Sequence, residues 1–402
     1  MKKYILFIFI FTLNLSATTL ISSKNLETLN SFNIEDNFID DRYTQRIYHY
    51  YLTHQKQKFL NMLNNGYDYI PLIKNQIQKA NIPNNLIFVA MAESYFSSKA
   101  RSNKKAIGLW QFMPKTAKRF NLKINKYIDE RKDPIKSTVA ALKYLSNLKS
   151  RLGKWYLAIM AYNCGEARVI EGITRAKLDK YCMHHKCKHN KTFHKYRQII
   201  YNYQYRHGSF RSLYRVYKRV NRLEKTLTLK ELLRYQRGLK RQYLPKETRL
   251  YIRKIVAMNF LLNSNQFVQY QNHNLLNRGI ISSLVKVDVP SGTSLKYIAN
   301  LLHINYRKLR SRNMHLRYPF TPPNEDSYIY IPYDKLALFK LTFNSTNIRK
   351  KIVYRVKKGD SLKVIAQKFH TTHTQIKKFN HLKTNTIYVN QKLIIPLYIT
   401  SK

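Results

Sequence analysis

A single glutamate stands near the end of an apolar run, LIFVAMAESY at residues 86–95. In a helix, Leu86, Val89 and Glu93 fall at i, i+3 and i+7 and share one stripe. Because burial disfavours a charged carboxylate, an acid on that apolar stripe would keep its proton near neutral pH, as a general acid requires. The alternative is a glutamate at a helix end that turns out to solvent, and the ten residues alone leave both open.

Helical patterns surround this stretch and must position the acid. Apolar spacing predicts helices over residues 42–63 and 67–80, before Glu93. Asp133 and Pro134 are typical of an N-cap and a first helical turn, and they open the pattern PIKSTVAALKYLSNLKSRL.

Two more helices are expected further along. The run WYLAIMAY from Trp155 is apolar nearly all round, which predicts a buried helix, and KETRLYIRKIVAMNFLLNS reads as an amphipathic helix that ends near Ser264. The first two thirds of the chain are therefore expected to be almost entirely α.

The last third changes character and repeats itself. VPSGTSLKYIANLLHINYRKLRSRN aligns without gaps on VKKGDSLKVIAQKFHTTHTQIKKFN, so that Gly292 matches Gly359 and Asn313 matches Asn380, each 67 positions later (359 less 292). Each copy reads as strand, glycine turn, helix, turn, helix and closing strand. We expect two small α+β units of βααβ order.

The first residues have the build of a secretory signal. MKKYILFIFIFTLNLSATT holds two lysines, an apolar run too short to span a bilayer comfortably, and small residues near Ala17. We expect a signal peptide over residues 1–17 and a polar linker over 18–40, with retention as an anchor as the alternative. This predicts an exported protein, periplasmic or associated with the cell envelope. No cysteine near Ala17 offers a lipid attachment point.

The formal net charge is +52, from 73 Lys and Arg against 21 Asp and Glu. Such a balance is common in nucleic-acid-binding proteins, but the export signal and the spread of basic residues along the whole chain argue against that class. Compositional bias explains part of the charge. A basic exported protein would adhere to an anionic envelope polymer.

Three cysteines are present. In an oxidising compartment, Cys182 and Cys187 favour a local disulfide, with free thiols as the second reading. A metal site with the neighbouring histidines is the third, but the spacing matches no common zinc pattern. Cys164 is expected to be a small packing residue. We expect no metal and no cofactor.

The second repeat, YRVKKGDSLKVIAQKFHTTHTQIKKFNHLKTNTIYVNQKLIIP, closely resembles a LysM domain, a module that binds polymers containing N-acetylglucosamine such as peptidoglycan and chitin. The resemblance covers residues 351–398. Asn390 stands where the family more often has Gly, and Asn tolerates the left-handed backbone. Glycan binding is implied at four residues: Gly359, Asp360, Ser361 and Asn380.

The first repeat, residues 283–334, resembles a LysM module that has drifted. Thr293 stands where the second repeat has Asp360, and a Pro-containing insertion occupies residues 320–323. Sugar binding and a spacer role both remain open for this copy.

The helical region resembles the catalytic domain of lytic transglycosylases of the soluble and membrane-bound D type. Four blocks occur in the family's order: AESYFSSKARSNKKAIGLWQFMPKTAKRFNL, DERKDP, AYNCGEARV and LPKETRLYIRK. The resemblance implies a mainly α, lysozyme-like domain over residues 41–265. The basic segment at about 174–243 is longer than expected between the family's blocks, and we expect it to be an added helical lobe over the substrate groove. The chain departs from the family at Ala167, where Gly is usual, and at Arg253, where Pro is usual.

The resemblance also implies a reaction. Glu93 would act as the single acid and base that cleaves the bond between N-acetylmuramic acid and N-acetylglucosamine without water. It implies further roles: Tyr162 orients Glu93, Asn163 forms the same wall, Ser94 lies at the cleavage subsite, and Gln111 and Met113 contact the sugars. For Tyr162 and Met113 simple core packing is the alternative. Peptidoglycan strands are the expected partner, with peripheral membrane contact and without nucleic acid.

The remaining acids near the motifs are assigned structural roles. Glu166 is expected at a helix start, and DERKDP at residues 129–134 is expected to form a salt-bridged cap. Two rival functions stay open: a hydrolytic muramidase, and an inactive scaffold that binds peptidoglycan.

Overall fold

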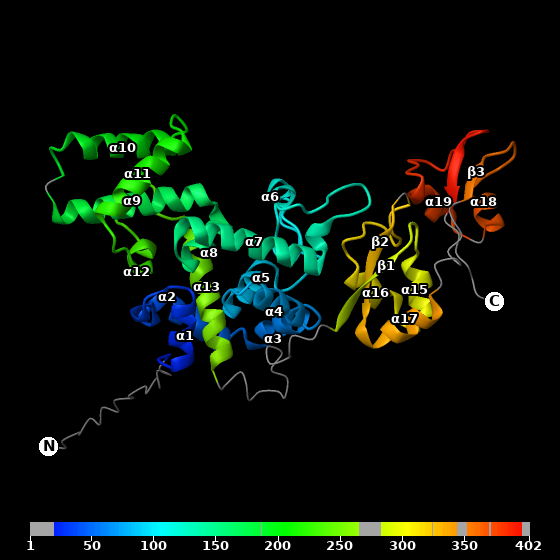
Figure 1. Cartoon of the computed structure of the whole chain (residues 1–402), viewed down its shortest axis with the longest axis horizontal. Coiled ribbons are helices and arrows are strands. Elements are labelled where there is room, and N and C mark those ends of the chain that lie inside the picture. Colours follow the sequence, from blue (N-terminus) through cyan, green and yellow to red (C-terminus); the bar gives the residue numbers. More distant parts are fainter. Residues whose placement is uncertain are drawn as a thin grey trace, which may run out of the picture.

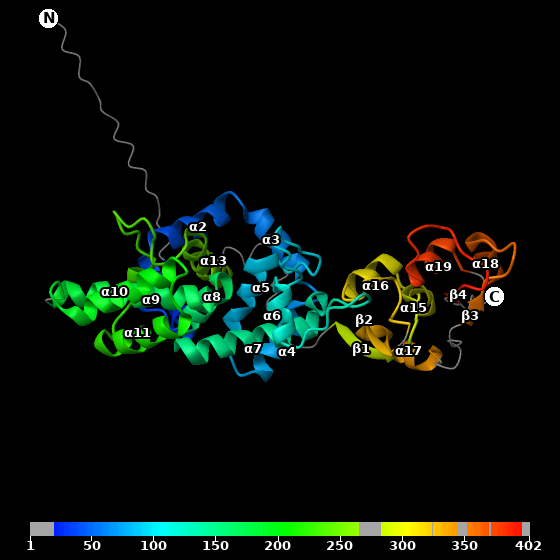
Figure 2. The same ribbon diagram turned by 90° about the horizontal axis from the view of Figure 1, so that it is seen from above.

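The computed structural model describes residues 20–264, 283–343 and 352–395, apart from Lys186, Asn324 and His370. Figures 1 and 2 show a helical body followed by two small α+β modules. The signal peptide expected at residues 1–17 lies outside the described residues. None of the helices in the described ranges is long and apolar enough to cross a membrane.

The body is built from helices, which confirms the mainly α prediction. In chain order they are α1 (Ser23–Ser31), η1 (Asp36–Asp40), α2 (Arg42–Thr53), α3 (Lys56–Asn65), α4 (Ile70–Lys79), η2 (Asn84–Leu86), α5 (Ile87–Ser94), α6 (Pro114–Arg119), η3 (Glu130–Lys132), α7 (Pro134–Leu152), α8 (Trp155–Cys164), α9 (Glu166–His184), α10 (Lys191–Gln204), α11 (Phe210–Leu223), α12 (Leu229–Leu233) and α13 (Lys246–Asn263).

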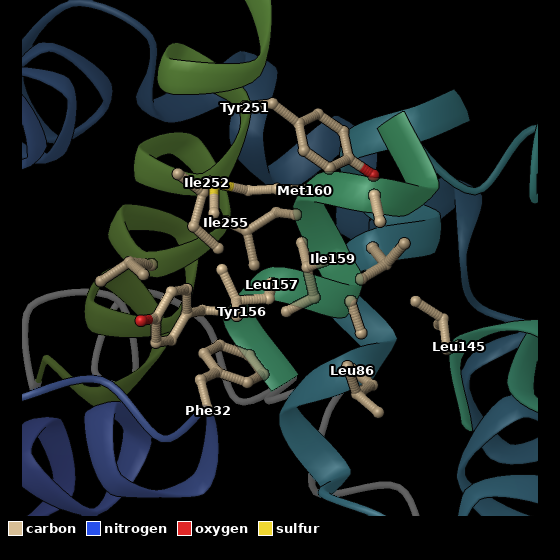
Figure 3. Close-up of a cluster of buried hydrophobic side chains, with 14 of the residues drawn as sticks. Phe32, Leu86, Leu145, Tyr156, Leu157, Ile159, Met160, Tyr251, Ile252 and Ile255 are labelled. Atoms are coloured by element: carbon tan, nitrogen blue, oxygen red, sulfur yellow. The ribbon is translucent and has the colours of Figure 1, made fainter. Parts of the chain in front are cut away.

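Helices α8 and α13 form the centre of the core. Residues 156–161 of α8 are all buried, as its apolar sequence predicts for a helix surrounded by others. Figure 3 shows the side chains of α8 between those of α13 and Leu86, with the Tyr251 ring at the edge of the cluster. Each fully buried Leu or Ile contributes roughly 1.5–3 kcal/mol, so this cluster holds the helices around Glu93 in place.

The prediction of a polar linker over residues 18–40 is wrong for its described part. Residues 20–40 hold α1 and η1, and Leu29, Phe32 and Phe38 are fully buried. Leu29 and Phe32 lie at i and i+3, so this polar stretch has one apolar stripe, which joins the main hydrophobic core.

The single helix predicted over residues 42–63 is two helices, α2 and α3, separated at His54 and Gln55. The Thr53 hydroxyl donates to the His49 carbonyl at 2.8 Å, a side-chain bond that competes with the helical pattern at this end of α2.

A buried ion pair joins α2 to α13. Arg253 donates from Nε and Nη2 to the two carboxylate oxygens of Asp41 at 2.8 and 3.0 Å, and both side chains are buried. Burial alone would raise the pKa of Asp41, but the hydrogen bonds and charge of Arg253, with bonds from Thr44, lower it overall. Arg253, which departs from the family's usual Pro, is thus the partner that holds the N-cap of α2.

The basic insertion forms a helical lobe from α9 to α12. Its expected start at about residue 174 falls inside α9, which continues unbroken to His184. The predicted Cys182–Cys187 disulfide is present and closes the turn after α9. Figure 1 places α8 and α13 between this lobe and α5. The expected position of the lobe over the substrate groove stays a prediction.

The loop between α5 and α6 depends on Gly108. Its φ is +85°, and a Cβ added there would lie 1.9 Å from the Arg131 carbonyl oxygen. Arg131 itself is held by Asp129, at 2.8 Å, and donates to the carbonyls of Lys105 and Phe112. The predicted salt-bridged cap at residues 129–133 is therefore confirmed, and it supports the loop that carries Gln111.

The two modules have the predicted βααβ order. The first comprises β1 (Leu284–Val289), α15 (Leu295–Leu301), α16 (Tyr306–Arg312) and β2 (Ser327–Pro332), followed by η5 (Tyr333–Lys335) and α17 (Leu336–Thr342). The second comprises β3 (Ile352–Arg355), α18 (Leu362–Lys368), α19 (His373–Phe379) and β4 (Lys392–Ile395). In each module the two strands pair antiparallel, with Leu284 opposite Pro332 and Ile352 opposite Ile395.

The repeated asparagine ends the second helix of each module and fastens it to the closing strand. Asn313 donates to the Leu309 and Tyr330 carbonyls and accepts from the Tyr330 amide at 2.7 Å. Asn380 makes the same three bonds, to Ile376 and Ile394. The sequence repeat is therefore a repeat of one structural bond set.

The first module is docked on the body. Asp133, the N-cap of α7, accepts hydrogen bonds from the hydroxyls of Tyr328 at 2.6 Å and Tyr330 at 2.9 Å, all three side chains being buried. Arg312 pairs with Asp68 of the body at 3.0 Å. These contacts set the orientation of the module relative to Glu93.

Replacing Gly108 with Ala should remove at least about 3 kcal/mol of stability, because the Cβ meets backbone that cannot yield. Gly153→Ala is the matched control, since its φ is +84° but nothing lies within 4 Å of the added Cβ. It should cost about 1–2 kcal/mol from backbone strain alone. Thermal unfolding of the full chain measures both, and equal losses would contradict the role of the Arg131 contact.

Replacing Tyr330 with Phe should destabilise the docked arrangement by about 1–3 kcal/mol, because the buried Asp133 carboxylate loses a donor. Tyr333→Phe, at an exposed tyrosine in the same module, should change nothing. Urea unfolding compares the variants. If Tyr330→Phe and Tyr333→Phe unfold at the same urea midpoint, the docking hydrogen bond does not contribute to stability.

Candidate active site

Glu93 lies in the last turn of α5, half-buried. Burial raises the pKa of its carboxyl from the ordinary 4.5 to about 7, against the opposing effects of a Tyr251 hydrogen bond and the charge of Lys254. The negative end of the α5 dipole acts in the same direction as burial. The predicted environment of the acid is therefore present: it holds a proton near neutral pH.

The hydroxyl that contacts Glu93 belongs to Tyr251 of α13, which donates to Oε1 at 2.6 Å. The expected partner was Tyr162, but its hydroxyl donates instead to the Trp110 carbonyl at 2.7 Å. Tyr162 still lies within electrostatic reach of Glu93, whose charge, after burial, helps raise the pKa of that phenol. Tyr162 thus positions the loop beside the acid, and Tyr251 orients the acid.

The end of α5 and the loop after it carry three of the other predicted residues. Ser94 is buried, and its hydroxyl donates to the Leu109 carbonyl at 2.8 Å, which ties the loop to α5. Gln111 has a φ of +46°, and its amide donates to the Gly108 carbonyl at 2.9 Å. Met113 is 42% exposed. Of these three, Met113 presents the most open side chain to a ligand.

The wall opposite the loop comes from α8 and α13. Asn163 accepts from the Thr248 hydroxyl at 2.7 Å, a bond that joins the two helices below Tyr251. Cys164 is a free thiol, half-buried beside this bond. Glu166 occupies the first turn of α9 and pairs with Arg151 at 2.9 Å, the helix-start role expected for it.

The four residues implied in glycan binding by the second module serve its own fold in this structure. Gly359 turns the chain with a φ of +89°, and Asp360 accepts from the Lys357 amide and the Tyr354 hydroxyl, both at 2.7 Å. Ser361 caps α18, and Asn380 makes the strand bonds described above. Asn390 has a φ of +67°, the left-handed conformation expected at this position.

Tyr251 is the functional residue that sequence reasoning missed. Its block, LPKETRLYIRK, was recognised, but no residue in it was singled out. Glu247, Tyr251 and Lys254 lie at i, i+4 and i+7, and all three influence the Glu93 carboxyl. That stripe was a usable signal, but the partner of Glu93, more than 150 residues away along the chain, could not be read from it.

Comparison with known families covers part of the body and both modules. Residues 71–181 match the transglycosylase SLT domain, residues 283–347 match the LysM-like domain of the lytic transglycosylase MltD, and residues 354–396 match the LysM domain. The chain is a lytic transglycosylase of peptidoglycan. Its SLT domain carries Glu93, and its two LysM-type modules follow.

Individual relatives agree with this architecture. This transglycosylase is 25% identical over 362 residues to the membrane-bound lytic murein transglycosylase D of Escherichia coli, covering 85% of this chain and 68% of the relative. It is 42% identical over 110 residues to a protein of Alteromonas sp. named for tributyltin chloride resistance, covering 27% and 53% of the two chains. It is also 31% identical over 114 residues to the N-acetylmuramoyl-L-alanine amidase sle1 of Staphylococcus epidermidis, covering 27% and 32%.

Titration of Glu93 should show a pKa near 7 by carbon NMR of the labelled carboxyl. Tyr251→Phe should raise that pKa further, because the substitution removes a hydrogen bond that stabilises the charged carboxylate. Tyr162→Phe is the matched control: its hydroxyl bonds to a carbonyl, so the Glu93 midpoint should stay in place. A Glu93 midpoint near 4.5, or a shift with Tyr162→Phe but not with Tyr251→Phe, would contradict this geometry.

Proposed function

We propose that this transglycosylase cleaves the β-1,4 bond between N-acetylmuramic acid and N-acetylglucosamine without water, with Glu93 as the single acid and base. The protonated Glu93 carboxyl gives its proton to the glycosidic oxygen, and the bond from that oxygen to C1 of the muramic acid breaks. N-acetylglucosamine leaves as an alcohol.

The second half of the reaction restores the acid. The C6 hydroxyl of the same muramic acid attacks C1, and the Glu93 carboxylate takes the hydroxyl proton. The product is a 1,6-anhydro sugar, and no water is consumed. The positive charge that develops at C1 is stabilised by the substrate's own N-acetyl group and by dipoles fixed in the site.

One observation carries this proposal: a half-buried acid in an SLT-type domain, with a pKa raised to about 7 and a tyrosine hydroxyl fixed on its carboxyl. An acid with a pKa near the working pH can give a proton and take it back in the same cycle. Tyr251 orients the carboxyl, and the loop tied by Ser94 and Tyr162 holds Gln111 and Met113 as the candidate sugar contacts.

The modules and the N-terminus suggest where this happens. We place the enzyme in the cell envelope after export, where the second LysM module holds it on the polymer. Linkage of a weak binding module to the catalytic body raises the effective concentration of substrate at Glu93.

A hydrolytic muramidase is the rival reaction, and it would need a base for an outside water. Glu247 is the acid whose charge reaches Glu93 most clearly, but it is exposed. The mass of the products separates the two reactions, because an anhydro product is lighter than a hydrolytic one by one water.

Digestion of purified sacculi by the full chain should therefore give anhydro products. Glu93→Gln should lower the rate by about 10²–10⁴-fold or more, because the amide can neither give nor take the proton. Glu166→Gln is the control, since that acid pairs with Arg151 on the surface, and it should keep its activity. Full activity in Glu93→Gln would end the assignment, and hydrated products would favour the muramidase.

A further inference from the structure

A shallow trough of about 410 Å³ runs beside the candidate active site, between α2 and α13. Ile47, Tyr50 and Tyr51 line it from α2, and Glu247, Leu250, Tyr251 and Lys254 line it from α13. Its volume lies in the range of sites that bind small ligands. Neither helix falls within residues 71–181, so the SLT match leaves this wall unassigned.

The trough and the candidate catalytic acid share one residue, Tyr251. Tyr251 lines it and also donates its hydroxyl to Glu93 at 2.6 Å. A group bound in the trough would therefore lie next to the group that receives the proton.

The walls are mainly apolar and aromatic, apart from Glu247 and Lys254, and they are open to solvent. Tyr50 is 53% exposed and Leu250 is 40% exposed, a clustering of exposed apolar side chains that marks binding surfaces. The Tyr50 ring is parallel to that of His54 at 5.8 Å, which restrains it. Burial raises the pKa of Tyr51 to about 12, so this hydroxyl remains a neutral hydrogen-bonding group. Rings with hydroxyl groups suit the apolar faces and polar rims of pyranose sugars.

Lys254 adds a cation at the end of the trough. Its ammonium lies 4.7 Å above the Tyr95 ring and 3.4 Å from the Tyr95 hydroxyl. In the described part of the chain no carboxylate lies within ion-pair distance of it. A carboxylate on the substrate would find an unpaired partner here.

A buried ion pair holds the two walls of the trough in position. The buried pair of Asp41 and Arg253 holds the start of α2 on α13, and Arg253 lies two residues after Tyr251 and one before Lys254. The segment before the SLT match thus supplies one side of the trough.

We propose that α2 and α13 form a saccharide subsite adjoining Glu93, in which Tyr50 and Tyr51 contact a pyranose ring and Lys254 pairs with a carboxylate of a peptide stem. This deepens the proposed function and rests on it. The occupant is the continuation of the glycan strand that reaches Glu93, because Tyr251 both lines the trough and contacts Glu93.

The test measures binding of soluble glycan fragments to the full chain carrying Glu93→Gln, in which turnover is removed. Tyr50→Leu should weaken binding of a stem-bearing peptidoglycan tetrasaccharide about tenfold, the effect of one lost ring contact. It should leave a disaccharide, too short to fill both subsites, unchanged. Tyr50→Phe keeps the ring and should bind normally, and Tyr201→Leu, at an equally exposed tyrosine of α10, controls for surface effects.

The carboxylate contact has its own comparison. Lys254→Met should weaken the stem-bearing tetrasaccharide about three- to fivefold and leave a peptide-free N-acetylglucosamine tetramer unchanged. Lys218→Met is the control, since that lysine also lies over a tyrosine ring, but on α11. The LysM modules are the same in every variant, so the differences report the trough.

The two proposals can fail separately. If Tyr50→Leu and Lys254→Met bind the tetrasaccharide as tightly as their controls, the subsite is wrong even where Glu93→Gln has abolished cleavage. If Glu93→Gln still cleaves sacculi, the catalytic assignment is wrong. The binding differences between the trough variants and their controls then test the subsite independently.

Discussion

The contact on which the molecule depends is the bond from the Tyr251 hydroxyl to the Glu93 carboxyl across two helices that are far apart in sequence. Around it the core of α5, α8 and α13 withholds water from the acid. That burial has a cost in stability. An unfolded glutamate titrates near 4.5 and Glu93 near 7, so the folded state holds the proton more tightly, and stability from this residue decreases as the pH rises between those values. The protein retains a destabilised group where chemistry needs it.

The loop from Tyr95 to Met113 likewise holds an unfavourable conformation that the surrounding structure maintains. Several residues there adopt left-handed backbone, among them Tyr95, Phe96 and Gln111, and such conformations persist when surrounding structure holds them. Ser94 fastens the loop to α5, Tyr162 fastens it to α8, and Gly108 lets it approach Arg131. The motif residues therefore act as a set: Ser94, Tyr162 and Gly108 keep the loop in place beside Glu93.

The two modules differ in how they relate to the body. Tyr328 and Tyr330 of the first meet the N-cap of α7, so that copy extends the body as one piece. The second module meets this assembly where His381 lies 3.0 Å from the Tyr127 hydroxyl and Phe379 packs on Phe320 at 4.6 Å between ring centroids. The first repeat has diverged in sequence and carries an insertion at residues 320–323. Its surface contacts the body and the second module.

Local patterns in the chain predicted a helical body, two βααβ repeats, the N-cap at Asp133 and the helix start at Glu166. They also favoured the disulfide of Cys182 and Cys187 and offered an acid on an apolar stripe, each with alternatives left open. Each of these depends on residues close in sequence or on a repeat, where periodicity and capping chemistry act directly. The lytic transglycosylase motifs added the order of the catalytic blocks.

Local sequence patterns could not decide which segments, distant along the chain, contact one another. The partner of Glu93 is Tyr251 and not Tyr162, the stretch before Asp41 packs into the core, and the first module rests on α7, because each contact joins segments separated by many residues. Such pairings are selected by the packing of whole helices, which minimises exposed apolar surface and leaves few buried polar atoms unpaired. The spacing of residues in the sequence shows which of them share one face of a helix or strand. Only the folded structure shows which side chains pack against that face.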